Sequence, residues 1–463
     1  MTRKIYLGLV TFCLTLTFLA IVPADAQAQG RKQKRKARKL AAQGEIMYRR
    51  RNYEQAIEKY AEALSIMPNF PFARFSKGYS HFNLKQYKQA IEELNAALEQ
   101  GYEPLEVYAV RWQAYFQTKD MDSAMKDVKK AQELDPSNDY FYIAEGQIDR
   151  EKKDFASAIV MFEKAENMGS KNGDLYFYLA EGYNVVRRYT EQGAAAEKAL
   201  KNGTRFPGRC WYFIGDTLRR EHKYEKAVNA YKTAKATNPD IYEIYGSLAD
   251  TYRNLNQFNN AVKIAQEGVR KYRNDANLYV SLSWYYSLAN KNVFAISVAK
   301  KAIELSPDSS TAHTNLCRAY NDTKEFNLAI KTCNKALELQ PGDGETYFYL
   351  GRAYQLLGKN RLSGSSYKKA VLGLIKTTQS RPNYSDGFYL LGNAYFADGQ
   401  KSKAIKAYED CLAISPRFAR ARYNLGYVYM QNGNQNKARA QHDALEKIDS
   451  VLAGKLLAVI ENE

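Results

Sequence analysis

Apolar residues along this chain recur three and four positions apart in pairs of short stretches, which is the spacing of amphipathic helices. A short turn such as Leu84-Lys85-Gln86 separates the two stretches of a pair. Proline follows the second stretch in many pairs, and because proline cannot continue a helix, it marks the end of the pair. The pattern therefore predicts an all-α chain built from helix-turn-helix units.

The units follow one another with a nearly constant period. A small residue followed three positions later by tyrosine returns every 34 residues, as in Ala249 with Tyr252 and Gly351 with Tyr354. The series has twelve members, and ten of its eleven intervals are 34 or 35 residues: Gly44, Gly78, Trp112, Gly146, Ala180, Gly215, Ala249, Ser283, Cys317, Gly351, Gly392 and Gly426. A self-similar period of this kind predicts a repeat protein rather than several globular domains.

Two further positions of the repeat recur, one occupied by a small residue and the other by proline. Twelve residues after the first small residue comes a second one, which is alanine in ten of the twelve units, as at Ala227 and Ala329. Proline closes six units in phase, and Pro382 is the same proline displaced by an insertion. Small residues let two helix axes approach closely, and one pair of helices cannot bury its apolar face alone, so the units should stack into an array.

This combination, with a small residue at position 8, Tyr at 11, Ala at 20 and 27 and Pro at 32, resembles the tetratricopeptide repeat (TPR) family. The resemblance covers residues 37–448. It implies a right-handed superhelical solenoid of about twelve repeats whose first helices line a concave groove for an extended peptide or a partner helix. Residues 450–461 are predicted to form a capping helix, and an insertion near residues 374–381 is predicted to lengthen the second helix of the tenth unit.

The N-terminus has the order of a secretory signal peptide. Arg3 and Lys4 precede an apolar stretch over residues 5–22, and the small-residue sequence Ala24-Asp25-Ala26 follows. We therefore expect residues 1–26 to be a signal peptide and the repeats to be periplasmic or secreted. No His completes a zinc pattern, and we expect the four cysteines that would remain after cleavage to be buried thiols, with a Cys317–Cys333 disulfide as the alternative.

The net charge of +18 lies mostly near the N-terminus, where the first 51 residues carry +10 and the other 412 carry +8. Within the leader, residues 27–39, seven cations run from Arg31 to Lys39. Such a run either faces water or attracts an anionic membrane surface. Because cations beside an apolar segment tend to stay in the cytosol, an uncleaved anchor over residues 5–22 with a cytosolic array is an open alternative. Binding to nucleic acid is not expected, since the charge is a property of the leader.

Positions 5 and 9 of each first helix should face the groove in the TPR geometry. Position 5 is aromatic in six of the twelve units, and position 9 is aromatic or arginine in five. Tyr and Trp give a large contact area with a polar tip, which suits protein binding. Arg318 and Arg352 have no acidic partner within a turn on the groove side of their own helices and are expected to bind a ligand carboxylate. The predicted binding residues are Phe75, Tyr79, Phe177, Tyr212, Trp284, Arg318, Phe348, Arg352, Tyr389, Tyr423 and Tyr427.

No pattern in the sequence indicates catalysis, a metal site or a cofactor. The four histidines are scattered over different units, and neither a phosphate-binding loop nor a metalloprotease motif occurs. The sequence therefore predicts a scaffold for extended peptides or partner proteins, acting in the assembly of envelope complexes. A membrane-surface tether that uses the basic leader is the competing hypothesis.

We expect signal cleavage after Ala26 or Ala28, because both follow the small-x-small pattern of such sites. N-terminal sequencing of the mature protein after cell fractionation would measure this. Full-length protein in the cytoplasmic membrane, with its repeats protected from external protease, would instead establish the uncleaved anchor.

Overall fold

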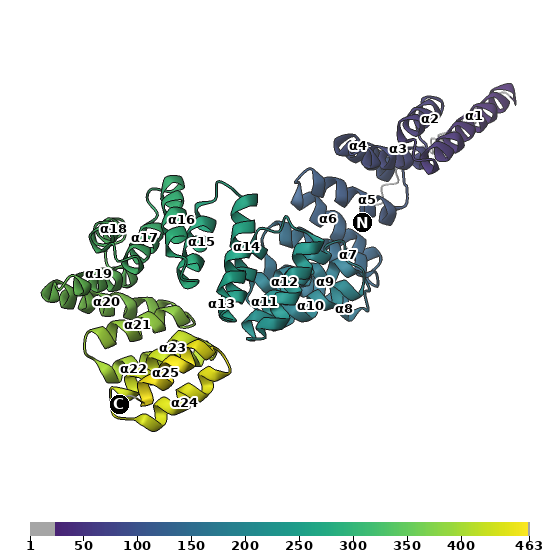
Figure 1. The fold of residues 1–463 in the computed structure, drawn as a ribbon. Helices are drawn as coiled ribbons and strands as arrows, with labels where there is room; N and C mark the ends of the chain where they lie inside the picture. The colour runs from purple at the N-terminus through teal and green to yellow at the C-terminus, as the bar shows by residue number, and fades with distance from the viewer. Residues whose placement is uncertain (1–23, 462–463) are drawn as a thin grey trace, which may run out of the picture. The chain divides into compact units, whose positions relative to one another are not determined.

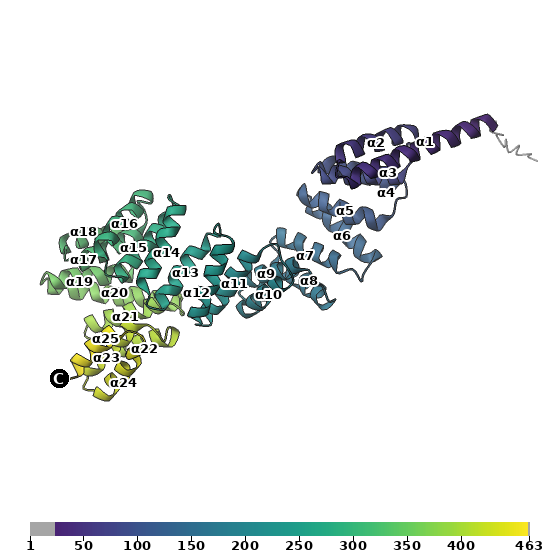
Figure 2. The ribbon, with the colours of Figure 1, turned by 45° about the vertical axis from the view of Figure 1, so that its right-hand side comes forward.

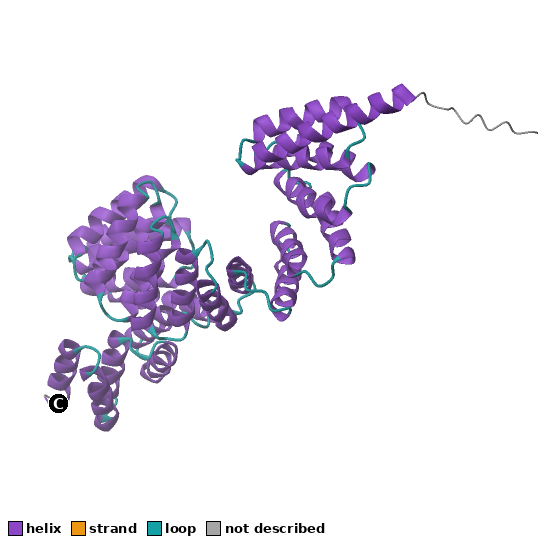
Figure 3. Ribbon diagram, turned by 90° about the vertical axis from the view of Figure 1, so that its right-hand side faces the viewer, coloured by secondary structure: helices purple, strands orange, loops and turns teal. Residues whose placement is uncertain are grey.

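The computed structural model describes residues 24–461, which form 25 helices and no strand (Figures 1 and 3). Residues 1–23 of the predicted signal peptide lie outside the described residues, and its last three residues, 24–26, lie in the first helix. Among residues 24–461 we find no helix that is both long and apolar enough to cross a membrane.

The chain divides into two compact units, and each is described by itself. The N-terminal unit extends to Ser170. Its helices are α1 Ala24–Arg49, α2 Tyr53–Ile66, α3 Pro71–Asn83, α4 Tyr87–Glu99, α5 Pro104–Gln117, α6 Met121–Leu134, α7 Asp139–Glu151 and α8 Phe155–Asn167.

The C-terminal unit begins at Lys171. Its helices are α9 Gly173–Val185, α10 Tyr189–Lys201, α11 Pro207–Arg220, α12 Tyr224–Thr237, α13 Glu243–Asn254, α14 Phe258–Lys271, α15 Ala276–Leu288, α16 Asn292–Leu305, α17 Ser310–Asp322, α18 Phe326–Leu339, α19 Gly344–Leu356, α20 Asn360–Ser380, α21 Ser385–Ala397, α22 Lys401–Ile414, α23 Ala419–Met430, α24 Gln435–Glu446 and α25 Ser450–Glu461. Odd and even helices pack as pairs, and neighbouring pairs pack on one another, so the fold is an all-α solenoid.

The turn inside each pair is built the same way throughout. One residue adopts a left-handed backbone conformation, such as Lys85 with φ 59° or Gly399 with φ 79°. The next residue then donates its N–H to a carbonyl in the last turn of the first helix, as from Gln86 to His81 over 2.9 Å. This geometry satisfies helix-end carbonyls and sets the second helix back against the first.

The two helices of a pair cross at the small residue of position 8. At five glycines an aromatic ring sixteen residues later lies so close that an added methyl group would come within 2.9 Å of it: Gly44 with Tyr60, Gly146 with Phe162, Gly215 with Tyr231, Gly351 with Tyr367 and Gly392 with Tyr408. Where position 8 is larger, as at Ala180 or Ala249, the residue sixteen positions later is alanine. In these units the two positions therefore divide one small volume between them, as a close-packed crossing requires. Trp112 and Val128 depart from this pattern, since both are large.

A disulfide joins Cys317 and Cys333 at this same crossing. The sequence-based expectation of four buried thiols is wrong for this pair, because positions 8 and 24 of one repeat face each other and both carry cysteine here. The other two cysteines of the described chain, Cys210 and Cys411, are buried and free, and burial raises the pKa of both thiols.

The extra residues of the tenth unit lengthen its second helix, so that α20 is 21 residues long where α18 and α22 have 14. At the end of the array, α25 buries Ala453, Leu456 and Ile460 against α23 and α24. It covers an apolar face that would otherwise be exposed, which is the role of a cap in a repeat protein.

We expect Gly392→Ala to destabilise the array by about 1 to 3 kcal/mol, because the new methyl group would lie 2.5 Å from the Tyr408 ring. Gly454→Ala in α25 is the matched control, since its methyl group would meet no atom within 4 Å. Alanine is the better helix former, so the control should be stabilised by up to about 1 kcal/mol. Thermal and urea denaturation would measure both changes, and a gain in stability for both variants would refute the close crossing.

Candidate functional site

A cavity of about 920 Å³ lies within the C-terminal unit and is lined by residues from the turn regions and first helices of its later repeats. We call it the C-terminal cavity. It forms because the solenoid curves until helices far apart in sequence meet: Arg253 at the end of α13 donates to Asp386 at the start of α21 over 2.9 Å. In Figure 2, α21 to α25 lie below the helices α15 to α20 that precede them.

Further polar contacts close the curve beside this pair. Arg420 of α23 donates to the carbonyl of Leu288 over 2.8 Å, and its guanidinium lies 5.4 Å from the centre of the Phe258 ring. The Asn256 side chain donates to the carbonyl of Arg417 over 3.0 Å. These contacts join residues more than 130 positions apart and hold the C-terminal repeats over the cavity.

Arg253 is held on two sides. Besides Asp386, its Nε lies 3.5 Å from Asp250, and its guanidinium lies 5.0 Å from the centre of the Trp284 ring. Asp250 also accepts a hydrogen bond from the buried Tyr285 hydroxyl at 2.8 Å. Burial opposes the charge of Arg253, but the neighbouring carboxylates raise its pKa, so it stays a cation inside the cavity wall.

Arg318 is buried, with an exposed fraction of 8%. Neighbouring side chains on α17 and α19 orient its guanidinium group. Asn315 accepts from its Nη2 at 2.7 Å, and Glu345 lies 3.7 Å from its Nη1. The Asn315 amide is itself fixed by donation to Ser283 and to the carbonyl of Val280, each at 3.0 Å. A repeat-to-repeat chain of contacts therefore sets where this guanidinium points.

The surroundings of Glu345 shift the pKa of its carboxyl group. Burial raises its pKa to about 7, while the nearby Arg318 guanidinium opposes the shift, and Asp343 and Asp386 add to it. Glu345 therefore becomes protonated, and loses its charge beside Arg318, within the physiological pH range.

The structure corrects the prediction that Arg318 and Arg352 lack partners. Arg352 donates to Asp322 over 2.8 Å, and Arg318 pairs with Glu345. Both carboxylates come from the neighbouring repeat rather than from the same helix, so a search within one helical turn could not find them. Arg352 remains half-exposed at the cavity, whereas Arg318 is buried.

Five of the eleven predicted binding residues line the C-terminal cavity: Trp284, Arg318, Phe348, Arg352 and Tyr389. The other six do not line it: Phe75, Tyr79, Phe177, Tyr212, Tyr423 and Tyr427.

Several of these aromatic residues instead pack between repeats. Phe177 is buried and stacks on Phe206 with ring centres 4.2 Å apart, and Phe75 stacks on Tyr102 at 4.4 Å. Tyr389 does both, since it lines the cavity and lies 5.1 Å from the Phe418 ring. At Phe75, Phe177 and Tyr389, the aromatic residue of position 5 thus packs on a ring at or next to the connection to the next repeat.

Sequence reasoning missed Glu345, Asp386 and Arg420 as cavity residues. Glu345 and Asp386 occupy the first turns of α19 and α21, and Arg420 lies in the first turn of α23. The only signal for them in the sequence is that position 2 carries a charged residue in these three repeats. Whether such a residue reaches the cavity depends on the curvature of the array. Asp250 and Arg253 lie three residues apart on α13, and their side chains pair at 3.5 Å.

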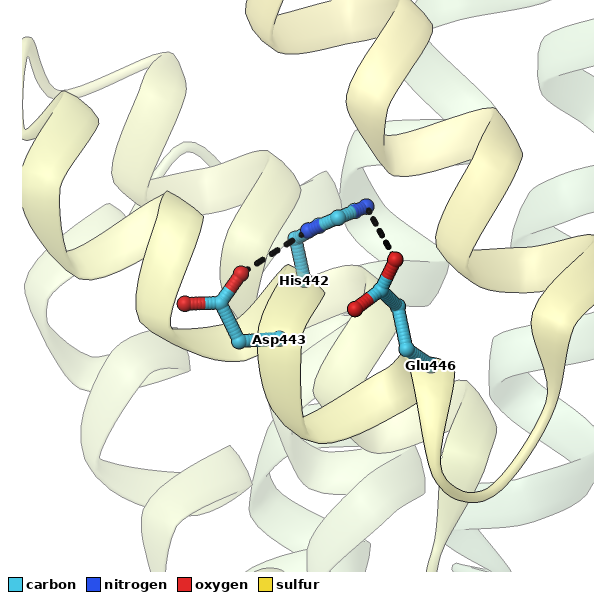
Figure 4. Close-up of side chains that lie close together, drawn as sticks. All are labelled: His442, Asp443 and Glu446. Atoms are coloured by element: carbon cyan, nitrogen blue, oxygen red, sulfur yellow. Dashed lines mark hydrogen bonds and ion pairs between the residues drawn. The ribbon is translucent and has the colours of Figure 1, made fainter.

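One group of candidate metal ligands occurs among the described residues, on α24 (Figure 4). Asp443 lies 3.0 Å from Nδ1 of His442, and Glu446 lies 4.0 Å from Nε2. The two carboxylates therefore face different ring nitrogens, whereas one ion would be bound through a single nitrogen. Both carboxylates are exposed, and we assign no metal site to them.

Three segments match families of repeat proteins. Residues 37–70 and 75–139 match families described as tetratricopeptide repeat, and residues 392–433 match one described as TPR repeat. Residues 213–347 match a family described as ChAPs (Chs5p-Arf1p-binding proteins).

A curated relative is the small glutamine-rich tetratricopeptide repeat-containing protein 2 of Saccharomyces cerevisiae. It is 34% identical over 65 residues, which are 14% of this chain and about a fifth of the relative (19%).

Two solved structures are similar to this chain at low identity. One is the APC/C hetero-tetramer Cut9–Hcn1, with 14% identity over 92% of this chain and 96% of that one and a TM-score of 0.36. The other is the C-terminal part of a TPR repeat-containing protein from Cytophaga hutchinsonii, with 18% identity over 60% of this chain and 96% of that one and a TM-score of 0.39.

The stacked helix pairs and the matched segments define the class as a helical-repeat scaffold for protein interactions. Within that class, the chain belongs to the tetratricopeptide repeat proteins.

We expect Glu345→Gln to change how stability depends on pH. Because the folded-state pKa of Glu345 is about 7 and thus above its usual value, protonation stabilises the folded state, and this contribution is lost as pH rises through 7. The neutral glutamine avoids the loss, so the variant should gain about 1 to 3 kcal/mol relative to wild type between pH 5 and pH 8.

Urea denaturation followed by circular dichroism at several pH values would measure this difference. Glu338→Gln on the exposed side of α18 is the control, and its pH profile should follow that of wild type. A parallel profile for Glu345→Gln and wild type would mean that Glu345 is ionised throughout.

Proposed function

We propose that this chain is an exported TPR scaffold that binds extended segments of partner proteins in the C-terminal cavity and acts in the assembly of envelope complexes. The observation that carries the proposal is the cavity itself, a hollow of about 920 Å³ lined by arginines and by the aromatic rings of Trp284, Phe348 and Tyr389. Rigid aromatic side chains beside oriented guanidinium groups are the residues that contribute most to protein-binding surfaces.

The composition of the cavity lining favours a polypeptide segment, because it combines arginines with aromatic rings. This lining comes from several successive repeats, so a ligand that contacts all of it must be extended. The ChAPs family, which matches residues 213–347, is described by its binding to Chs5p and Arf1p, and this description agrees with a protein as the ligand. We propose no catalytic role for the chain.

Export is proposed from the signal-like order of residues 1–26, and the repeats of an exported chain would lie in the periplasm or outside the cell. A second candidate function is a tether at a membrane surface. It is favoured by the seven cations between Arg31 and Lys39, all of which are exposed along α1 and could bind anionic lipid. Retention of residues 5–22 in the mature protein would favour this second function.

Site-specific photocrosslinking tests the scaffold function. A photoreactive phenylalanine analogue at Phe348, which lines the cavity, should crosslink to discrete partner proteins in cells. The matched control is the same analogue at Val293, which lies on α16 in the same unit and is 74% exposed.

Crosslinks from position 348 that are absent from position 293 would support binding in the cavity. Equal crosslinking from both positions, or partners only from position 293, would place the binding surface elsewhere.

A further inference from the structure

The C-terminal cavity has more positive than negative charge. Six cations line it, namely Arg253, Arg318, Arg352, Arg417, Arg420 and Lys455. Three carboxylates line it, and each pairs with one arginine: Asp386 with Arg253, Glu345 with Arg318 and Asp322 with Arg352.

The remaining three cations face no carboxylate of the cavity lining. Arg420 donates to a backbone carbonyl and lies over Phe258, and Arg417 pairs with the exposed Glu225 at 2.9 Å. Lys455 of α25 borders the cavity and also a second hollow of about 510 Å³ that shares Arg420 and Leu452 with it. An anionic ligand would therefore meet a net attraction along one side of the cavity.

Buried donors of the wall lack partners among the described residues. Nε of Arg318 and Oγ of Ser287 are both buried without a hydrogen bond, and both residues line the cavity. Each such group costs free energy while it is unsatisfied. Oδ1 of Asn292, an acceptor of another lining residue, is also buried without a hydrogen bond, so the unsatisfied atoms of the wall include donors and an acceptor.

The pairing of Arg318 is also incomplete. The 3.7 Å between Nη1 of Arg318 and the Glu345 carboxylate is too long for a hydrogen bond. By contrast, Arg253 forms a hydrogen-bonded ion pair with Asp386 at 2.9 Å. A carboxylate from outside could approach Arg318 more closely than Glu345 does.

We propose that the C-terminal cavity binds an acidic, extended segment of a partner protein, whose carboxylates contact Arg318 and Arg352 and displace Glu345 from Arg318. The proposal rests on the scaffold function and names the chemical class of its partner. Aromatic side chains of the segment would lie against Phe348 and Tyr389, which stand beside these arginines in the cavity wall. An acidic polypeptide is favoured over a nucleic acid because four of the six cations already pair with carboxylates at fixed positions, which would repel a continuous phosphate backbone.

Binding of such a segment should strengthen as the pH falls from 8 to 6. The charged and titratable groups that face Glu345 are Arg318 from α17, Asp343 and Tyr349 from α19 and its cap, and Asp386 and Tyr384 from α21 and its cap. The tyrosines stay neutral because burial raises the pKa of both. Protonation of Glu345, with a pKa of about 7, removes one negative charge beside Arg318, so the cavity becomes more positive.

The test uses the mature protein and a short fluorescent peptide of alternating glutamate and tyrosine, with glutamine replacing glutamate in the control peptide. Fluorescence anisotropy at physiological salt should show binding of the acidic peptide alone. The double variant Arg352→Gln with Lys455→Gln should weaken it by about tenfold or more, the loss expected when hydrogen bonds to charged groups are removed.

The matched control is the double variant Arg270→Gln with Lys263→Gln. Both residues are exposed on α14 and lie outside the cavity lining, and the change in net charge is the same. Its affinity should match that of wild type, and circular dichroism should show that both double variants remain folded. Equal weakening in the two would reduce the interaction to nonspecific charge attraction and overturn the proposal.

Glu345→Gln provides a second, independent measurement. Because glutamine mimics the protonated acid, this variant should bind the acidic peptide at pH 8 as tightly as wild type binds it at pH 6, with little change between the two. Unchanged pH dependence in the variant would show that Glu345 does not compete with the ligand.

Failure of this proposal can be told from failure of the scaffold function. Partners crosslinked at position 348 together with no binding of the acidic peptide would leave the scaffold standing and refute the acidic ligand. Tighter binding of a single-stranded RNA oligonucleotide than of the acidic peptide, lost in the cavity variant, would assign the site to nucleic acid instead.

Discussion

The close crossing of two helices within each repeat is the contact on which the rest of this structure depends. Position 8 of the first helix and position 24 of the second share one small volume, filled by glycine and a ring at Gly392 and Tyr408 or by two small residues at Ala249 and Ala265. The crossing fixes how the two helices of a repeat meet, and the stacking of one repeat on the next follows from it. The Cys317–Cys333 disulfide is a covalent version of the same contact.

Small rotations between repeats add up, and in the C-terminal unit they bring the ends of α13 and α15 within hydrogen-bonding distance of residues at the start of α21 and α23. The contacts that close this curve are polar: Arg253 with Asp386, Asn256 with the carbonyl of Arg417, and Arg420 with the carbonyl of Leu288. Buried ion pairs contribute little net stability because of their desolvation cost, but they penalise any arrangement that leaves one partner unpaired. Their main effect here is to specify how far the array curves, and so to define the cavity.

The cavity combines this curvature with charge that the fold does not fully balance. Arg318 is held by Asn315, which is itself held by α15, so its position depends on the packing of two neighbouring repeats. Cys317, the residue before Arg318, is tied to α18 by the disulfide, which anchors the same helix from its other side. Stiff elements therefore carry the charged groups of the site, as a preorganised binding surface requires.

The sequence by itself determined the repeat period, the helix pairs and their turns, the lengthened helix α20 and the helix that follows the last repeat. These features depend on periodicity and on contacts between neighbouring helices, so residue spacing encodes them directly. It also singled out Trp284, Phe348 and Tyr389, which line the C-terminal cavity. Only the tertiary structure decided which cations are paired, since Arg318 and Arg352 find their carboxylates on adjacent repeats and Arg253 finds Asp386 at a distance of 133 residues. Contacts over such distances result from the accumulated curvature of many repeats, and no spacing within one repeat encodes that curvature.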